Sequence, residues 1–175
     1  MKKNFLKLSL LLLFTGTTLV SCSDDDGNSV QPQSTIADMV ATNSNFSKLN
    51  QALGRAGLAT VLDGDGQYTV FAPTNAAFDA YLTANGYSGV DQVPVTALKN
   101  LLLNHVVGME VMSSNIATGY VSTLSPMTAT ENSPKISMYI MKSGNTVTIN
   151  GGAANGGSTV TSADMDASNG VVHVV

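Results

Sequence analysis

The chain has 175 residues, 43% of them hydrophobic and only 11% charged, which favours one folded domain with accessory segments and excludes a disordered chain. Its net charge of −4 opposes binding to nucleic-acid phosphates, and its single cysteine excludes an intrachain disulfide or a multi-cysteine zinc site. With no tryptophan and 6% aromatic residues, the composition is sparse for a module that stacks sugars or bases.

The first 21 residues have the layout of a secretory signal peptide. A basic start, Met1–Lys7, precedes an apolar stretch, Leu8–Phe14, that is too short for a membrane span. Leu19–Cys22 then resembles a bacterial lipobox, which implies cleavage before Cys22 and acylation of its sulfur and freed amine. Two or three acyl chains would anchor the protein stably in a membrane. The alternative is a cleavable peptide followed by a buried free cysteine.

Residues 22–34 are predicted to be a lipidated cysteine followed by a flexible acidic and polar linker. Ser23–Asp26 resembles the serine-acidic export signals of Bacteroidetes surface lipoproteins, which implies an outer-membrane anchor with exposure at the cell surface. The alternative is a solvated acidic linker. From Cys22 onward, five basic and twelve acidic residues leave a charge of −7, so we expect no nucleic-acid partner and no direct docking on anionic lipids.

The first half of the folded body has helical periodicity interrupted by one strand. Thr35 and Asp38 form the pattern of a capping box, and Gly57 is placed to end a helix that starts at Asn45. The further elements expected are a short helical turn at 58–62, a strand at 68–71, a helix capped by Thr74 or Asn75, and a helix opened by Pro94.

The acidic turn Asp63–Gly66 resembles the start of a calcium loop. A calcium loop of the helix-loop-helix kind needs a glycine at its sixth position and a carboxylate at its twelfth. Those positions hold Tyr68 and Thr74, so we predict a plain turn and no metal site.

The second half is predicted to consist of strands, with a turn at Gly144–Asn145 and a Gly- and Asn-rich loop at 151–158. Helices come first and strands later, which predicts an α+β domain. The strands are expected at 104–108, 120–124, 136–141, 146–149, 159–161 and 171–175.

Three segments resemble the signatures of fasciclin domains, in the right order and spacing. They are Tyr68–Phe78, the segment Leu101–Gly108 around the central His, and Ala163–Met165 followed by Asn169–Val174. The resemblance covers residues 35–175. It implies a wedge of two β-sheets with helices packed along one side, and adhesion to another cell, matrix or polysaccharide without enzyme activity or a cofactor.

The chain departs from the family pattern in two places. Asn104 stands where the family has a tyrosine before the central histidine, which weakens an adhesive role for that pair. The family also continues past the last strand with an Asp and a Leu-rich end, whereas the printed sequence stops at Val175. The sequence is then either a fragment or a domain that closes differently.

Four residues are candidates for partner binding through the resemblance: Asn104, His105, Asp164 and Met165. His105, among aliphatic neighbours, is equally interpreted as a boundary imidazole with one satisfied hydrogen bond. Asp164 and Met165 match the Asp-Ile pair to which integrin binding is attributed in animal relatives. The alternative is that Asp164 caps a turn and Met165 fills the core.

No constellation for catalysis is apparent. His173 alternates with Val171 and Val175 and is interpreted as structural, and neither histidine has a carboxylate or Cys at ligand spacing. A further hypothesis is that the Gly- and Asn-rich loop and the Thr- and Ser-rich strands form a polar surface for carbohydrate. The sequence therefore predicts an adhesion module on a lipid tether, with a polysaccharide-binding accessory lipoprotein of a glycan uptake system as the alternative.

Overall fold

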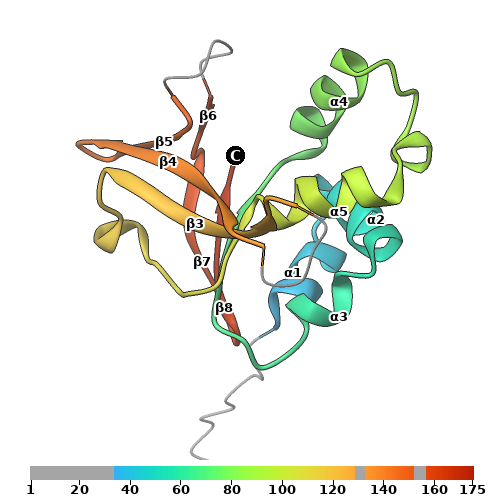
Figure 1. Cartoon of the computed structure of the whole chain (residues 1–175). Coiled ribbons are helices and arrows are strands. Elements are labelled where there is room, and N and C mark those ends of the chain that lie inside the picture. Colours follow the sequence, from blue (N-terminus) through green and yellow to red (C-terminus); the bar gives the residue numbers. More distant parts are fainter. Residues whose placement is uncertain (1–33, 129–132, 152–156) are drawn as a thin grey trace, which may run out of the picture. The chain divides into compact units, whose positions relative to one another are not determined.

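The computed structural model describes residues 34–128, 133–151 and 157–175 (Figure 1). The predicted signal peptide (1–21), Cys22 and the predicted linker up to residue 33 lie outside the described residues. The helices are α1 Ile36–Thr42, α2 Ser47–Ala56, α3 Ala59–Leu62, α4 Asn75–Ala84 and α5 Val95–Leu103, with 3₁₀ turns at Ser44–Phe46, Val90–Gln92 and Ser113–Asn115. The strands are β1 Tyr68–Ala72, β2 Val106–Val107, β3 Gly119–Pro126, β4 Lys135–Ser143, β5 Thr146–Ile149, β6 Ser158–Thr159, β7 Ser162–Ala167 and β8 Gly170–Val174.

The predicted capping residues begin the helices α1 and α4. The Thr35 hydroxyl accepts a hydrogen bond from the Asp38 N–H, and the Asp38 carboxylate accepts one from the Thr35 N–H, so the capping box is confirmed. At α4, the Thr74 hydroxyl accepts from the Ala77 N–H. Each cap pairs a backbone donor that would otherwise lack a partner at the start of a helix.

The second helix begins later than predicted. The Asn43 side chain accepts from the Asn45 N–H and caps a 3₁₀ turn, so regular α-helix starts only at Ser47. Gly57 ends this helix with φ at 67°, and Leu58 folds back to donate its N–H to the Leu53 carbonyl, as predicted.

Sheet A is mixed and joins strands from both halves of the chain. Its order is β2-β1-β8-β7, with β1 parallel to β8 and the other pairs antiparallel. Gly170, at the start of β8, faces Tyr68 with φ at 139°, and a Cβ there would lie 2.0 Å from the Tyr68 carbonyl oxygen. Only glycine permits this close approach of the two strands.

Sheet B is antiparallel, in the order β3-β4-β5-β6. Gly144, with φ at 60°, makes the predicted hairpin turn between β4 and β5. Side chains alternate along these strands, so Met138, Ile140, Val147 and Ile149 are buried on one face while the other face is exposed.

Strand β7 was not predicted. Its sequence, Ser-Ala-Asp-Met-Asp-Ala, has neither β-branched nor aromatic residues. The register shifts between Ser162 and Met165, and Asp164 in that bulge has φ at 59°. Pairing with the hydrophobic strand β8 overrides the weak local preference of this segment.

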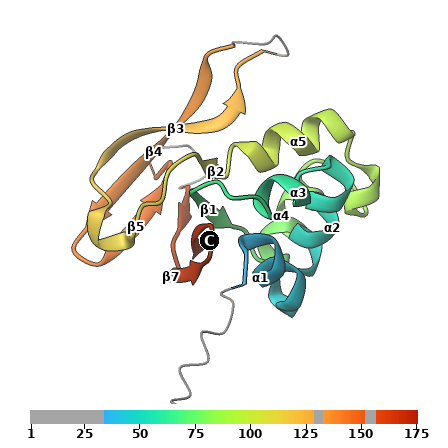
Figure 2. The ribbon, with the colours of Figure 1, turned by 90° about the horizontal axis from the view of Figure 1, so that it is seen from below.

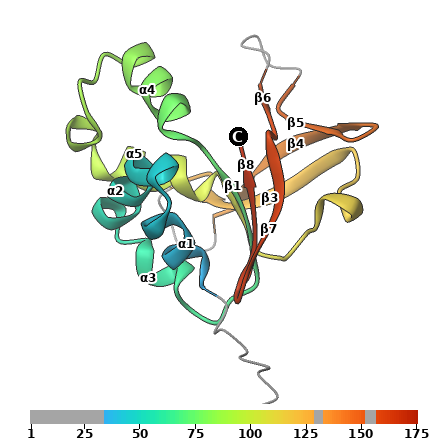
Figure 3. The same cartoon turned by 180° about the vertical axis from the view of Figure 1, so that it is seen from behind.

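The two faces of sheet A pack against different layers (Figures 2 and 3). Val70, Ala72 and Val172 lie in the core shared with the helices, and this core also buries Phe46 and Leu98. Phe71 and Val107 turn to the opposite face and share a second core with sheet B. The fold is thus α+β, with two sheets and helices along one side, as predicted. No helix in the described part of the chain has the length and apolar character needed to span a membrane.

Candidate functional site

The predicted site residues fall into two groups at different edges of sheet A. Asn104 and His105 lie at the junction of α5 and β2, and β2 is one edge strand. Asp164 and Met165 lie on β7, which is the other edge strand. The fold therefore does not combine the four residues into one site.

Asn104 and His105 fasten the end of α5 to its neighbours. The Asn104 side-chain oxygen accepts a hydrogen bond of 3.3 Å from the Thr123 hydroxyl on β3. The His105 carbonyl accepts from the Phe71 N–H, which ties the junction to β1. Asn104 is thus a contact between α5 and sheet B in this chain.

The tautomer of His105 follows from its hydrogen bond. Nδ1 lies 2.8 Å from the Leu101 carbonyl, which can only accept, so Nδ1 carries the proton. Burial lowers the pKa of His105, although the bond to the carbonyl acts in the opposite direction. His105 is therefore held as a neutral imidazole.

His105 also lines a small apolar pocket. The pocket has a volume of about 240 Å³ and lies between α4, α5 and the end of β8. Its other walls include Phe78, Tyr81, Leu101 and Val175.

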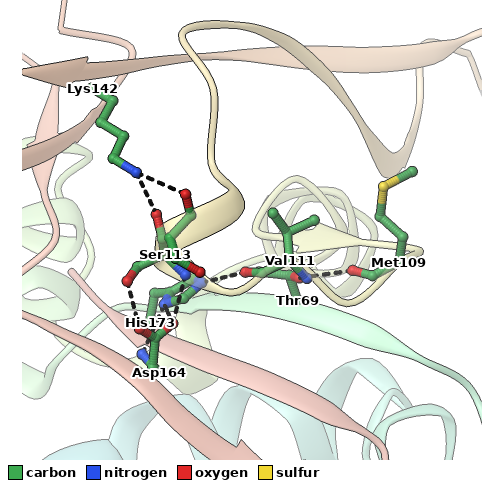
Figure 4. A network of polar contacts seen from close by, with 8 residues as sticks. Thr69, Met109, Val111, Ser113, Lys142, Asp164 and His173 are labelled. Atoms are coloured by element: carbon green, nitrogen blue, oxygen red, sulfur yellow. Dashed lines mark hydrogen bonds and ion pairs between the residues drawn. The ribbon is translucent and has the colours of Figure 1, made fainter.

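Asp164 points toward the segment that joins β2 to β3 (Figure 4). The Ser113 N–H donates to Asp164 Oδ1 at 2.6 Å, and the Ser113 hydroxyl donates to Oδ2 at 2.5 Å. Partial burial acts to raise the pKa of the Asp164 carboxyl, but the two Ser113 bonds, with His173 and Lys142 nearby, hold the pKa below its ordinary value of 3.8. Asp164 is thus an ionised anchor for Ser113.

Three further side chains hold the same segment, which we term the anchored segment (residues 109–115). Thr69 Oγ1 donates to the Met109 carbonyl at 2.7 Å and accepts from the Val111 N–H at 2.8 Å. His173 Nε2 donates to the Val111 carbonyl at 2.9 Å. On the other side, Lys142 Nζ donates to the Ser113 carbonyl at 2.8 Å and reaches the Ser114 carbonyl at 3.1 Å. Side chains from both sheets therefore form hydrogen bonds that hold the anchored segment in place.

Ser113, Asp164 and His173 are the residue types of a hydrolytic triad, but their arrangement is different. His173 is fully buried, and its Nδ1 accepts from the Asp164 backbone N–H at 3.2 Å while Nε2 is occupied by Val111. Neither ring nitrogen can take a proton from the Ser113 hydroxyl, which donates to the carboxylate instead. The geometry lacks the base that would activate a serine nucleophile.

A larger apolar cleft lies beside the anchored segment. It has a volume of about 350 Å³ and opens between β1–β2 and β3–β4. Phe71, Val107 and Ile140 line it, and Met109 and Tyr120, which are 57% and 79% exposed, also border it. Apolar concavities of this size are a usual location for ligand binding.

Met165 is half-buried and packs against the helical core, which matches the core interpretation made from sequence.

No group of three or more metal-ligating side chains occurs among the residues that the structure describes. Sequence reasoning missed Ser113, Lys142 and Thr69, because each meets its partner across a long stretch of chain. Thr69 lies within the Tyr68–Phe78 signature, but that signature does not indicate its contacts with Met109 and Val111. The left-handed Asp164 also has no signal beyond the tolerance of aspartate for that conformation.

Comparison with known proteins identifies related chains. The sequence profile of the Fasciclin domain family matches residues 44–175. The protein sll1483 of Synechocystis is 35% identical over 141 residues, covering 81% of this chain and 70% of that protein. The transforming growth factor-beta-induced protein ig-h3 of Sus scrofa is 32% identical over 143 residues, covering 80% of this chain but only 18% of that protein.

A solved structure gives independent support for the fold. A FAS1 domain pair from the insect cell adhesion molecule Fasciclin I superposes with a TM-score of 0.61 at 13% sequence identity. The match covers 82% of this chain and 49% of that chain. At this identity, the likeness concerns the fold alone.

Proposed function

The chain belongs to the fasciclin domain family, and on that premise we propose that it is a cell-surface adhesion module tethered by a lipid on Cys22. The family is one of adhesion and interaction modules rather than enzymes. The family match over residues 44–175 is the observation that carries the adhesive role. The lipobox-like Leu19–Cys22 supports the tether, and Ser23–Asp26 supports an outer-membrane location facing outward.

The proposed mechanism is multivalent. One domain makes weak contacts with a protein or polysaccharide on another cell or matrix. Many anchored copies raise the effective concentration at the second surface, and avidity can then exceed the single-site affinity by about 10² to 10⁴. The polar linker before Thr35 lets each domain stand off from the membrane.

Loss of the anchor tests the tether. In cells that make the Cys22→Ser variant, we expect the chain to move from the membrane fraction to the soluble fraction and cell clumping to fall to background. Ser29→Ala, in the same linker, should change neither measurement. A variant that stays in the membrane fraction would contradict acylation of Cys22.

Surface exposure has a separate test. Protease added to intact cells should remove the chain without lysis. A chain that stays protected until the cells are lysed would exclude an outward-facing location while leaving the lipid anchor intact.

The second candidate is a polysaccharide-binding accessory lipoprotein of a glycan uptake system. The exposed face of sheet B favours it, since it carries many hydroxyl side chains. Binding to a glycan array without cell clumping would support this candidate, and clumping without glycan preference would support general adhesion.

A further inference from the structure

The outward face of sheet B carries two tyrosine rings that are surrounded by serine and threonine hydroxyl groups. Tyr120 on β3 is directly opposite Tyr139 on β4, and their ring centroids lie 5.0 Å apart with the planes tilted by 54°. Tyr120 is 79% exposed, which is unusual for a ring that already has an aromatic neighbour. We call this pair the tyrosine platform.

Strand register gives the other residues of this face. Directly opposed residues of antiparallel strands share a face, and every second residue of a strand joins them. The pairs Ser122–Ser137, Met141–Thr148 and Ser143–Thr146 therefore lie on the same side as the tyrosine platform, together with Thr159.

The face between the Ser122–Ser137 pair and the Ser143–Thr146 pair carries no charged side chain. Lys142 points to the opposite side, where its ammonium group binds the anchored segment. Lys135 lies on the same side as Ser137 but beyond this area, and its ammonium group donates to the Leu124 carbonyl. The result is a neutral surface made of two aromatic rings, one methionine and several hydroxyls.

The backbone of Tyr139 is fixed from both sides. On one side it pairs with Tyr120. On the other, the Tyr139 N–H donates to the Asn150 side-chain oxygen at 2.9 Å, and the Tyr139 carbonyl accepts from the Asn150 N–H at 2.7 Å. Asn150 reaches this position through a left-handed backbone with φ at 51°. The backbone that carries the Tyr139 ring is thus fixed before any partner arrives, which lowers the entropy cost of binding.

We infer that the tyrosine platform binds a neutral polysaccharide. A sugar ring has an apolar C–H face that suits a tyrosine ring and a rim of hydroxyls that suits serine and threonine side chains. This inference rests on the proposed function and specifies its ligand class and binding surface.

Other partners fit this face less well. Protein interfaces are enriched in tyrosine and methionine, which this face carries, but they are depleted in serine, whereas Ser122, Ser137 and Ser143 surround the rings. Single-stranded nucleic acid stacks on aromatic rings but also needs cations along its backbone, and the face has none within the pairs named above. The charge of −7 from Cys22 onward also disfavours acidic polysaccharides.

The test compares retention on several immobilised neutral polymers and includes one pair, hydroxyethyl cellulose and carboxymethyl cellulose, that shares a backbone but differs in charge. The exported chain, purified in a detergent without a sugar head group, is applied to hydroxyethyl cellulose, carboxymethyl cellulose, amylose, mannan and a β-1,3-glucan. We expect retention on at least one neutral polymer. We also expect Tyr120→Ala and Tyr139→Ala to weaken it by about tenfold, the loss of one aromatic contact.

Two variants serve as controls. Tyr120→Phe keeps the ring and should bind within about twofold of the unmodified chain. Val95→Ala removes an apolar side chain that is 50% exposed on α5 and should have no effect. Thermal unfolding of every variant checks that the domain remains folded.

Three results would overturn the inference: no retention on any neutral polymer, unchanged retention in both alanine variants, or stronger retention on the carboxymethylated polymer. Cell clumping is measured with the same variants. Clumping that persists when polysaccharide retention is absent rejects the platform and leaves the proposed adhesion standing. Retention without any clumping supports the platform and rejects cell adhesion.

Discussion

Asp164 combines a left-handed backbone with a carboxylate that already accepts two hydrogen bonds from Ser113. Its side chain is 33% exposed, and its backbone N–H donates to the buried His173. These contacts explain the residue as an anchor between β7 and the anchored segment. Partner binding by Asp164 and Met165 stays a prediction that the following variant separates from the structural role.

Replacing Asp164 with alanine should destabilise the domain by about 3 kcal/mol. The variant loses two hydrogen bonds to a charged acceptor, and alanine tolerates the left-handed backbone less well than aspartate. Asp164→Asn tolerates that backbone and keeps one acceptor, so it should cost about 1 kcal/mol. Urea unfolding measures both. Unchanged stability with lost adhesion would instead make Asp164 a partner contact.

His105 should make stability depend on pH near neutrality. Its pKa in the folded domain lies below the ordinary value of 6.5, so the unfolded chain binds more protons as pH falls through 6.5. Stability is therefore full above about pH 6.5 and declines as pH falls toward the lower pKa of the folded state. The lowered pKa of Asp164 acts below its ordinary 3.8, outside this range.

The variant His105→Gln isolates this effect, because a glutamine amide can still donate to the Leu101 carbonyl. Melting temperatures at pH 7.5 and 5.5 should differ less in the variant than in the unmodified chain. Since His173 is present in both, it contributes equally. Equal differences would show that burial of His105 does not set the pH response.

At the level of elements, the predictions that succeeded rest on strong local signals. The Thr35 cap, the Gly57 helix end and the Gly144 turn each depend on residues within a few positions of one another. Strands β4 and β5 were likewise expected at 136–141 and 146–149, on either side of that turn. Strand β7 failed the same test because its pairing with β8, rather than its own composition, makes it a strand.

The candidate site was less predictable than the fold. His105 was identified through the family resemblance, but the grip on the anchored segment depends on Thr69, Lys142 and His173, which different strands supply. The tyrosine platform could not be predicted from the sequence for a similar reason. The overall aromatic content is low, and only strand pairing brings Tyr120 and Tyr139 together.

Asn169 shows how one side chain joins several elements. Its oxygen accepts from the Ile36 N–H at the start of α1, and its amide nitrogen donates to the carbonyls of Leu62 and Gly64. The side chain is 3% exposed and lies in the turn between β7 and β8. A single amide thus links the first helix, the end of α3 and the last hairpin.

Asn169→Ala should destabilise the domain by at least about 3 kcal/mol, because three backbone groups lose their partner at about 1 kcal/mol or more each. Asn145→Ala, in the exposed hairpin turn, is the matched control and should stay within about 0.5 kcal/mol. Chemical denaturation compares them. A similar small loss in both variants would refute the role of Asn169 as a link.

For the molecule as a whole, charge should control how copies on facing surfaces approach one another. The charge of −7 from Cys22 onward makes them repel, and the Debye length falls from about 30 Å at 0.01 M salt to about 8 Å at 0.15 M. Clumping of cells that display the chain should therefore increase over this range of sodium chloride.

Neutralising the acidic run, Asp24–Asp26, to asparagine should reduce that salt dependence, since it removes three negative charges close to the proposed lipid anchor at Cys22. Turbidity of the cell suspension is the measurement. Clumping that decreases as salt rises would show that attraction between opposite charges, rather than repulsion, governs the approach.

The parallel pairing of β1 with β8 has a consequence for the order of events in folding. Tyr68 pairs with Gly170, so the centre of sheet A joins segments far apart along the chain. Such non-local pairing makes folding slow, because a long loop must close before the contacts form. A nascent chain cannot complete this sheet until β8 has been synthesised. On the proposed route of export, this topology therefore keeps the polypeptide unfolded until its last strand has crossed the membrane.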